Sequence, residues 1–148
     1  MNNQLKSIEK IMELKERHFN ESQVQYQLAM DYFEDVGQRL FSILKAKEQI
    51  ETKLNSSMKT RVKAFELVNT HEQLERLKQQ ENELQAKVHQ ARVNLNDKEE
   101  KRTKAHFEFK KLEKVKERRV MDIKQRLKSE ENQQLDEISV QQYVRLNG

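Results

Sequence analysis

The sequence predicts an all-α protein, a long antiparallel two-helix coiled-coil hairpin with a C-terminal helical overhang. The 148 residues include no Pro and only two Gly, so the chain lacks the residues that build most turns. Nearly half of the residues are Ala, Glu, Lys, Leu or Arg, a composition typical of long helices and coiled coils. Apolar residues also recur every seven positions in two long series. We therefore expect neither an all-β fold nor a Rossmann-like α/β fold.

The first helix is expected over residues 1–54. Its apolar positions repeat every seven residues, and a second series follows three residues later, as in the two seam positions of a heptad. Lys15 and Ser22 also fall on this seam, which indicates either an imperfect seam or a soft point where the hairpin flexes. The apolar seam residues of this helix are Leu5, Ile8, Met12, Phe19, Tyr26, Phe33, Val36, Leu40, Ile43 and Ile50.

The turn is expected within residues 55–69. The segment 55–61 contributes no seam residue, and its Asn and Ser side chains compete for the hydrogen bonds of a helical backbone. The second helix is then predicted over 70–128, with residues 129–148 as a tail or a short helix. All 148 residues are expected to form a single hairpin domain. The predicted seam residues of the second helix include Val88, Leu95, Phe109 and Leu112.

Two registers satisfy the pairing rule of an antiparallel coiled coil. In the first, Leu5 faces Leu112 and Leu40 faces Leu77; in the second, Leu5 faces Arg119. The first register pairs more apolar layers, but the margin is too small to decide between them. In both, the chain beyond about residue 113–120 has no partner helix, although apolar residues continue. These overhanging residues either fray, fold back on the hairpin or dock into another protein.

The sequence offers no candidate catalytic or metal-binding residues, and we expect no enzyme activity and no cofactor. Two Gly cannot build a phosphate-binding loop, and the four His are isolated from one another along the predicted helices, so no pair of them has the spacing of a helical metal site. No apolar run approaches the ~20 residues that span a bilayer, and no secretory signal opens the chain, so a cytoplasmic location is expected.

The basic stretch 97–128 raises nucleic-acid binding as a weaker alternative. Its Lys and Arg residues alternate with seven carboxylates, which would repel phosphates. It also follows the heptads, whereas the basic region of a basic-zipper protein precedes them. We therefore expect no nucleic-acid partner.

Three sequence blocks resemble the FliJ family of flagellar export proteins. They are Glu13-Leu14-Lys15, the segment Phe109-Lys110-Lys111-Leu112-Glu113-Lys114, and the segment from Leu135 to Tyr143. The last two are similar to Gram-positive members. The resemblance covers the whole chain, and the C-terminal block is its more specific part because it lies outside the heptads.

The resemblance implies a component of the flagellar type III export apparatus, in the cytoplasm and peripheral at the inner face of the membrane through its partners. Such proteins are similar to the central stalk of a rotary ATPase. The implied partners are the hexameric export ATPase FliI, the export gate protein FlhA and escort chaperones such as FliT and FlgN, and the hairpin is expected to be monomeric. A generic coiled-coil scaffold and a chaperone for one export substrate remain alternatives.

Two sets of contact residues follow from the resemblance and the overhang. The ATPase is expected to bind Val120, Ile123, Leu127, Leu135 and Ile138. The export gate is expected near Leu74, Leu77 and Leu84, although the seam of the hairpin claims the same side chains. Only Leu77 matches the gate-binding pattern of enteric members, which in this chain falls on Gln73, Leu77, Gln80 and Leu84.

Overall fold

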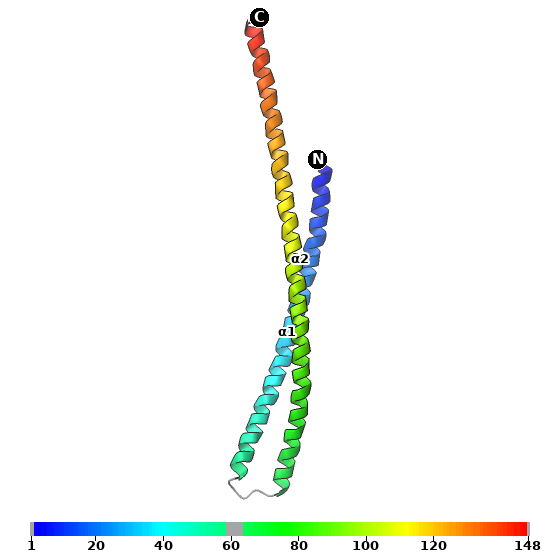
Figure 1. Ribbon diagram of the computed structural model, residues 1–148, viewed down its shortest axis with the longest axis vertical. Helices are drawn as coiled ribbons and strands as arrows, with labels where there is room; N and C mark the ends of the chain where they lie inside the picture. Colours follow the sequence, from blue (N-terminus) through cyan, green and yellow to red (C-terminus); the bar gives the residue numbers. More distant parts are fainter. Residues whose placement is uncertain (1, 59–63, 148) are drawn as a thin grey trace. The chain divides into compact units, whose positions relative to one another are not determined.

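The computed structural model describes residues 2–58 and 64–147, and all of them are helical (Figure 1). Helix α1 spans Asn2–Met58 and helix α2 spans Ala64–Asn147. Neither range contains a Pro, and α2 carries Glu66 in its first turn and Arg145 in its last, as the helix dipole favours. The predicted fold class is confirmed, because the two helices pack against each other in opposite directions.

Both helices extend further than the sequence suggested. Residues 55–58 and 64–69 of the expected turn region are helical, and α2 continues through the expected tail to Asn147. Asn and Ser cost a helix only about 0.5–0.7 kcal/mol each relative to Ala, and an established helix elongates without a new nucleation step. Hydroxyl groups near the connection also bond to the helix itself, as Thr70 Oγ1 donates to the Glu66 carbonyl (2.8 Å). The rest of the expected turn, residues 59–63, lies outside the described residues.

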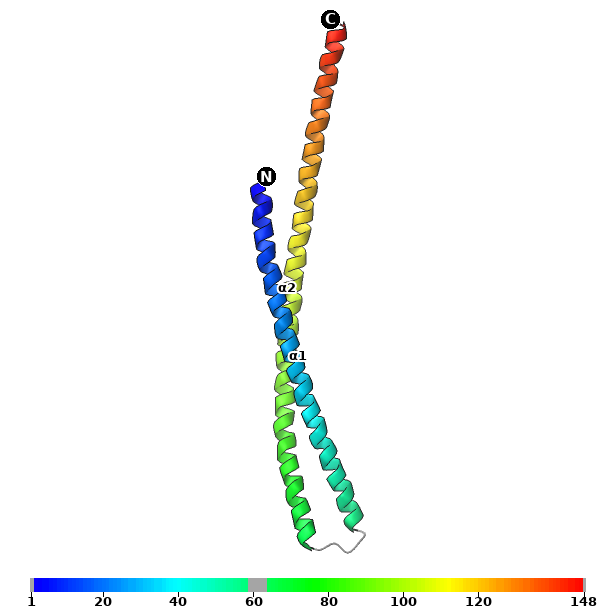
Figure 2. The same cartoon turned by 180° about the vertical axis from the view of Figure 1, so that it is seen from behind.

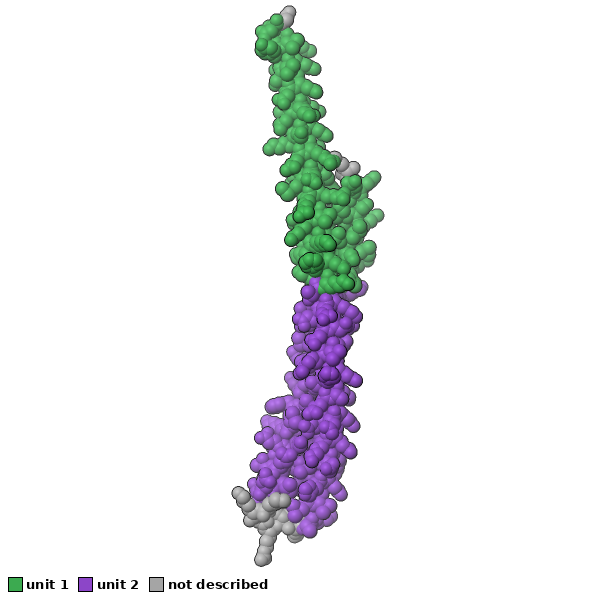
Figure 3. Space-filling view, viewed as in Figure 1, with its two compact units in different colours: residues 1–19, 104–148 green, residues 20–103 purple. Residues whose placement is uncertain are grey.

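The helices contribute to two compact units, each containing part of both (Figure 3). Unit 1 comprises residues 1–19 and 104–148, and unit 2 comprises residues 20–103.

In unit 2, the core is a row of apolar side chains between the antiparallel helices. Val36 is 1% exposed, and Ala29, Leu74, Ala91 and Leu95 are also buried. The contacts between the two helices show that they are antiparallel, because residues later in α1 contact residues earlier in α2. Lys47 Nζ lies 3.1 Å from Glu81 Oε2, Arg92 Cζ lies 5.8 Å from the ring centroid of Phe33, and Arg102 Cζ lies 4.0 Å from that of Tyr26.

In unit 1, the start of α1 packs along α2 in the same antiparallel sense, and Ile8 and Ala105 are buried. The ring centroids of Phe19 and His106 are 5.0 Å apart, and Lys15 Nζ lies 3.1 Å from Glu108 Oε2.

Within each unit, these contacts match the second register. The second register would place Lys15 opposite Phe109, and Lys15 is observed to pair with the neighbouring residue, Glu108. The first register would instead place Lys15 opposite Arg102. The pairing Leu5–Leu112 of the first register is therefore not the one observed. Size explains the outcome better than a count of apolar layers, because the second register sets Phe19 opposite Ala105 and Phe33 opposite Ala91, so that large rings meet small side chains.

All fourteen predicted seam residues lie on the packed sides of the helices. Ile8, Val36 and Leu95 are buried, and the remaining eleven are half-buried, as expected where only two helices cover each other.

Candidate protein-interaction site

The candidate site is the part of α2 that extends past the start of α1 in unit 1. Near the start of α1, Lys116 Nζ lies 3.5 Å from Glu9 Oε1, and Arg119 Nη1 donates a hydrogen bond to Gln4 Oε1 (3.0 Å). Beyond Ile123, every described residue of α2 is exposed. We call residues 120–147 the arm; it is orange to red in Figures 1 and 2.

The arm carries all five residues predicted to bind the ATPase. Helical geometry places Val120, Ile123, Leu127, Leu135 and Ile138 on one face, within about 120° around the axis. Val120 and Ile123 are half-buried at the root of the arm, whereas Leu127, Leu135 and Ile138 are 54%, 61% and 51% exposed. The structure thus brings the five side chains onto a single stripe that α1 covers only at its root.

A groove marks the root of the arm. It has a volume of about 570 Å³ and lies between Met12 of α1 and Val120 and Met121 of α2. Its polar rim consists of Glu113, Lys116 and Glu117. The stripe therefore begins in a concave apolar surface and continues along a free helix.

Charge divides the arm into two halves. Lys124, Arg126 and Lys128 make the first half basic, and the segment from Glu130 to Glu137 makes the second half acidic. A partner surface that covers the whole stripe would have to present the opposite order of charges.

Sequence reasoning left several exposed apolar residues of the arm out of the site. Leu146 is 85% exposed, and the others are 60–68% exposed. Tyr143 and Val144 lie on the face of the helix opposite Ile138. The heptad pattern does not select these residues. They could have been added to the candidate site from the absence of a partner helix, because every face of an unpaired helix is exposed. These further residues are Met121, Val140, Tyr143, Val144 and Leu146.

The three residues expected near the export gate lie in the seam of unit 2. Leu74 is 8% exposed, and Leu77 and Leu84 are half-buried, so these side chains pack toward α1. Gln73 and Gln80 on the same stretch are exposed.

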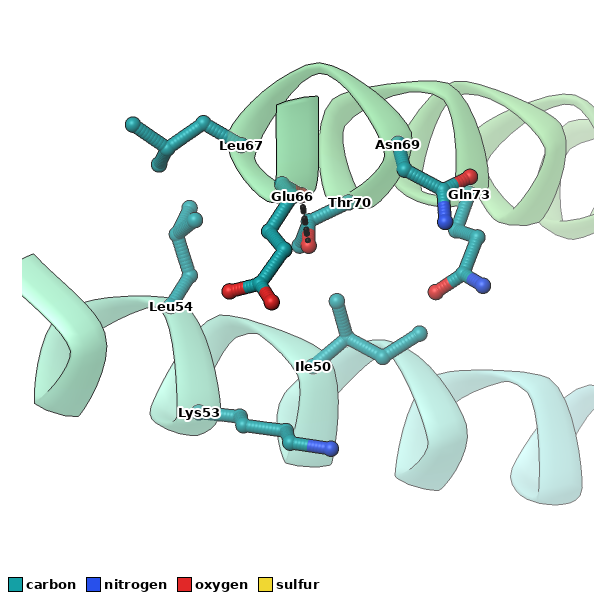
Figure 4. Close-up of a pocket in the computed structure, with 8 residues that line it drawn as sticks. All are labelled: Ile50, Lys53, Leu54, Glu66, Leu67, Asn69, Thr70 and Gln73. Carbon is teal, nitrogen blue, oxygen red and sulfur yellow. Dashed lines mark hydrogen bonds between the residues drawn. The ribbon is translucent and has the colours of Figure 1, made fainter. Parts of the chain in front are cut away.

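Other apolar side chains are available near the start of α2. Phe65 is 81% exposed and Val68 is 58% exposed. Close to them, a groove of about 420 Å³ opens between the helices (Figure 4). In Figure 4, Ile50 of α1 and Glu66 of α2 point into this groove, and Leu54 points toward Leu67. These residues fell within or beside the expected turn and were not considered as a site.

One titratable group in unit 1 is clearly perturbed. A hydrogen bond from Lys15, together with the positive charge of that ammonium group, lowers the pKa of Glu108 below its ordinary value of 4.5. This ion pair stands at the polar seam position of α1 and gives Lys15 a partner there.

The described part of the chain shows no metal-binding cluster. No group of three or more His, Asp or Glu side chains in residues 2–58 and 64–147 could hold a metal ion. Over the same residues, neither helix has an apolar stretch long enough to cross a membrane.

Comparisons with known proteins agree with one another. A protein-family model described as "Flagellar FliJ protein" matches residues 4–148. The Flagellar FliJ protein of Bacillus subtilis (strain 168) is 27% identical over 136 residues, which cover 92% of this chain and 92% of that protein. No solved structure matches the chain with significant similarity.

Proposed function

The chain belongs to the flagellar FliJ family, and from this premise we propose that it docks through its arm into the hexameric export ATPase FliI. Membership makes the protein a component of the flagellar export apparatus. The finer statement, that the arm acts like the central stalk of a rotary ATPase, is our proposal.

The observation that supports it is the stripe of apolar residues on a helix without a partner. Burying one Leu or Ile side chain contributes about 1.5–3 kcal/mol. Leu127, Leu135 and Ile138 together could therefore supply a large share of a binding energy that the free chain leaves unused. A single exposed helix is also narrow enough to enter the central opening of a ring.

Size-exclusion chromatography of the full chain with the export ATPase tests this proposal. Leu127→Asp combined with Leu135→Asp is expected to abolish co-elution, because two charges would enter the apolar contact. Val93→Asp is the matched control, since Val93 is equally exposed (56%) on the same helix but lies in unit 2. Circular dichroism verifies that helicity is kept. Co-elution of the double variant at the level of the wild type would refute docking through the arm.

For the export gate protein FlhA, we propose a contact near the start of α2. Leu74, Leu77 and Leu84 lie in this part of α2, but their side chains pack against α1. Phe65 and Val68 are exposed nearby and are therefore the side chains that we expect to touch the partner. Phe65→Asp is expected to weaken gate binding and to leave ATPase binding unchanged, whereas the arm variant is expected to do the reverse. A Phe65→Asp protein that binds the gate normally would refute this assignment.

The remaining proposals concern the oligomeric state, the location and the other partners of the protein. We propose that it is an elongated monomer in the cytoplasm and that its partners hold it at the inner face of the membrane. We also propose that it binds escort chaperones. A generic coiled-coil scaffold would instead self-associate through its seam. Sedimentation velocity at micromolar concentration separates the two, because the monomer is expected at 17.9 kDa.

A further inference from the structure

The outer face of α1 in unit 2 carries an apolar stripe that the packing of the hairpin does not use. Val24, Leu28 and Tyr32 follow one another at intervals of four residues and are 57%, 58% and 49% exposed. Residues at this spacing lie on one face of a helix and here extend over about 12 Å. The seam residues of the same segment, among them Ala29 and Val36, point about 100° away and are buried against α2.

Carboxylates surround this stripe. Glu21, Asp31 and Asp35 fall on the same face as Val24 and Leu28, and no Lys or Arg occurs between Arg17 and Arg39. The whole chain has a net charge of +4, so this negative segment departs from the average of the protein.

Few of these carboxylates have a charged partner in the part of the chain that the structure describes. Asp35 pairs with Arg39 (3.1 Å), and Asp31 accepts a hydrogen bond from Gln27 (2.9 Å), which is uncharged. Glu21 has no ion pair among the described residues. On α2, Lys101, which the register brings near this part of α1, already pairs with Asp97 (3.1 Å).

We propose that this acidic stripe is a docking surface for a basic amphipathic helix of a partner protein. The three apolar side chains match the apolar face of about two turns of such a helix, and the carboxylates would pair with Lys or Arg on its flanks. The stripe shares no residue with the arm and does not include Phe65, so its variants test a contact other than those proposed for the ATPase and the export gate.

Fluorescence anisotropy of a labelled synthetic helix, with leucine on one face and lysine on the other, tests the proposal against the full chain. Leu28→Gln is expected to weaken binding by at least about tenfold, as for a central contact residue. Glu21→Gln combined with Asp31→Asn is expected to weaken binding and to reduce its salt dependence. Phe41→Gln is the matched control, because Phe41 is 67% exposed on the other side of α1, and it is expected to bind like the wild type.

Three results would overturn the proposal. The first is failure of the wild-type chain to bind the peptide, or equal binding of a peptide with the same residues in scrambled order. The second is undiminished binding to Leu28→Gln, which would place the peptide elsewhere, for instance on the acidic half of the arm. The third is self-association of the chain that Leu28→Gln abolishes, because the stripe would then belong to a contact between two copies.

Discussion

The guanidinium group of Arg102 lies over the ring of Tyr26, with Cζ 4.0 Å from the ring centroid. Arg92 stands over Phe33 in the same manner, at 5.8 Å, and His106 lies beside Phe19. Each of these aromatic residues occupies the same heptad position of α1. The guanidinium groups of Arg92 and Arg102 therefore meet aromatic faces of α1. The long polar side chains beside the seam contribute to packing instead of only interrupting it.

A double-mutant cycle measures the contact between Arg102 and Tyr26. Tyr26→Leu keeps an apolar side chain in the seam but removes the aromatic face, and Arg102→Met keeps the length of the side chain but removes its charge. We expect a coupling free energy of about 0.5–1 kcal/mol from urea unfolding, because both residues are half-buried. A coupling of zero would mean that the two side chains are neighbours without a mutual attraction.

The register is testable by engineered disulfides, because the chain has no Cys of its own. Ala29→Cys with Leu95→Cys joins residues that face each other in the observed register, and it is expected to cross-link under mild oxidation. Ala29→Cys with Val88→Cys would join partners of the alternative register and is expected to stay reduced. Non-reducing gel electrophoresis distinguishes the two proteins. The opposite pattern would show that the apolar layers, and not the fit of large against small side chains, set the alignment.

The fold class could be predicted from sequence because it depends on repeated, local properties: the lack of Pro, the helix-forming composition and the heptads. The register could not be predicted by counting apolar pairs, since Ala91 and Ala105 count as weakly apolar but are the residues that accommodate Phe33 and Phe19. The helix ends were misjudged near residues 55–58 because local propensity is small beside the cooperativity of a long helix.

The candidate site was predictable only in part, for a related reason. The arm could be predicted because apolar residues of the second helix continue beyond the point where the first helix ends. This difference in length follows from the whole chain and does not depend on the register. Phe65, Val68 and Leu28 could not be identified from the sequence, because the exposure of a side chain depends on which side of its helix faces the other helix. That side can be predicted only when the register of the hairpin is known.

Gly37 offers a route to a more stable protein. It lies inside α1 with an ordinary helical backbone, and a Cβ added there would meet nothing within 4 Å. Gly37→Ala is therefore expected to raise the free energy of unfolding by about 0.5–1 kcal/mol, by reducing the freedom of the unfolded chain. The midpoint of urea denaturation reports the change. A loss of stability would show that the helix needs the extra freedom of Gly at this point.

The pair of Lys15 and Glu108 predicts a pH-dependent contribution to stability. Because the pKa of Glu108 is lowered in the folded state, its contribution is fully present above the ordinary value of 4.5 and is lost as the pH falls through the folded pKa. The difference in urea midpoint between the wild type and Glu108→Gln is therefore expected to be constant near neutral pH and to shrink in acid. Salt is expected to shrink it as well.

The matched control for this pair is Glu99→Gln. Glu99 is an exposed carboxylate of the same helix without an ion pair among the described residues, and its replacement is expected to change the midpoint little at any pH. A difference for Glu108→Gln that persists unchanged in acid would assign its effect to the loss of a hydrogen bond or of packing.

The arm is expected to exchange its amide hydrogens quickly in the free chain. A single helix in water gains no tertiary packing, so residues 124–147 should open far more often than the buried stretches around Val36 and Ala91. Hydrogen exchange followed by mass spectrometry measures both regions in one experiment. Addition of the export ATPase is expected to slow exchange in the arm and to leave the seam of unit 2 unchanged. Slow exchange in the arm of the free chain would show that another surface already covers it, and slowing confined to residues outside the arm would place the ATPase contact elsewhere.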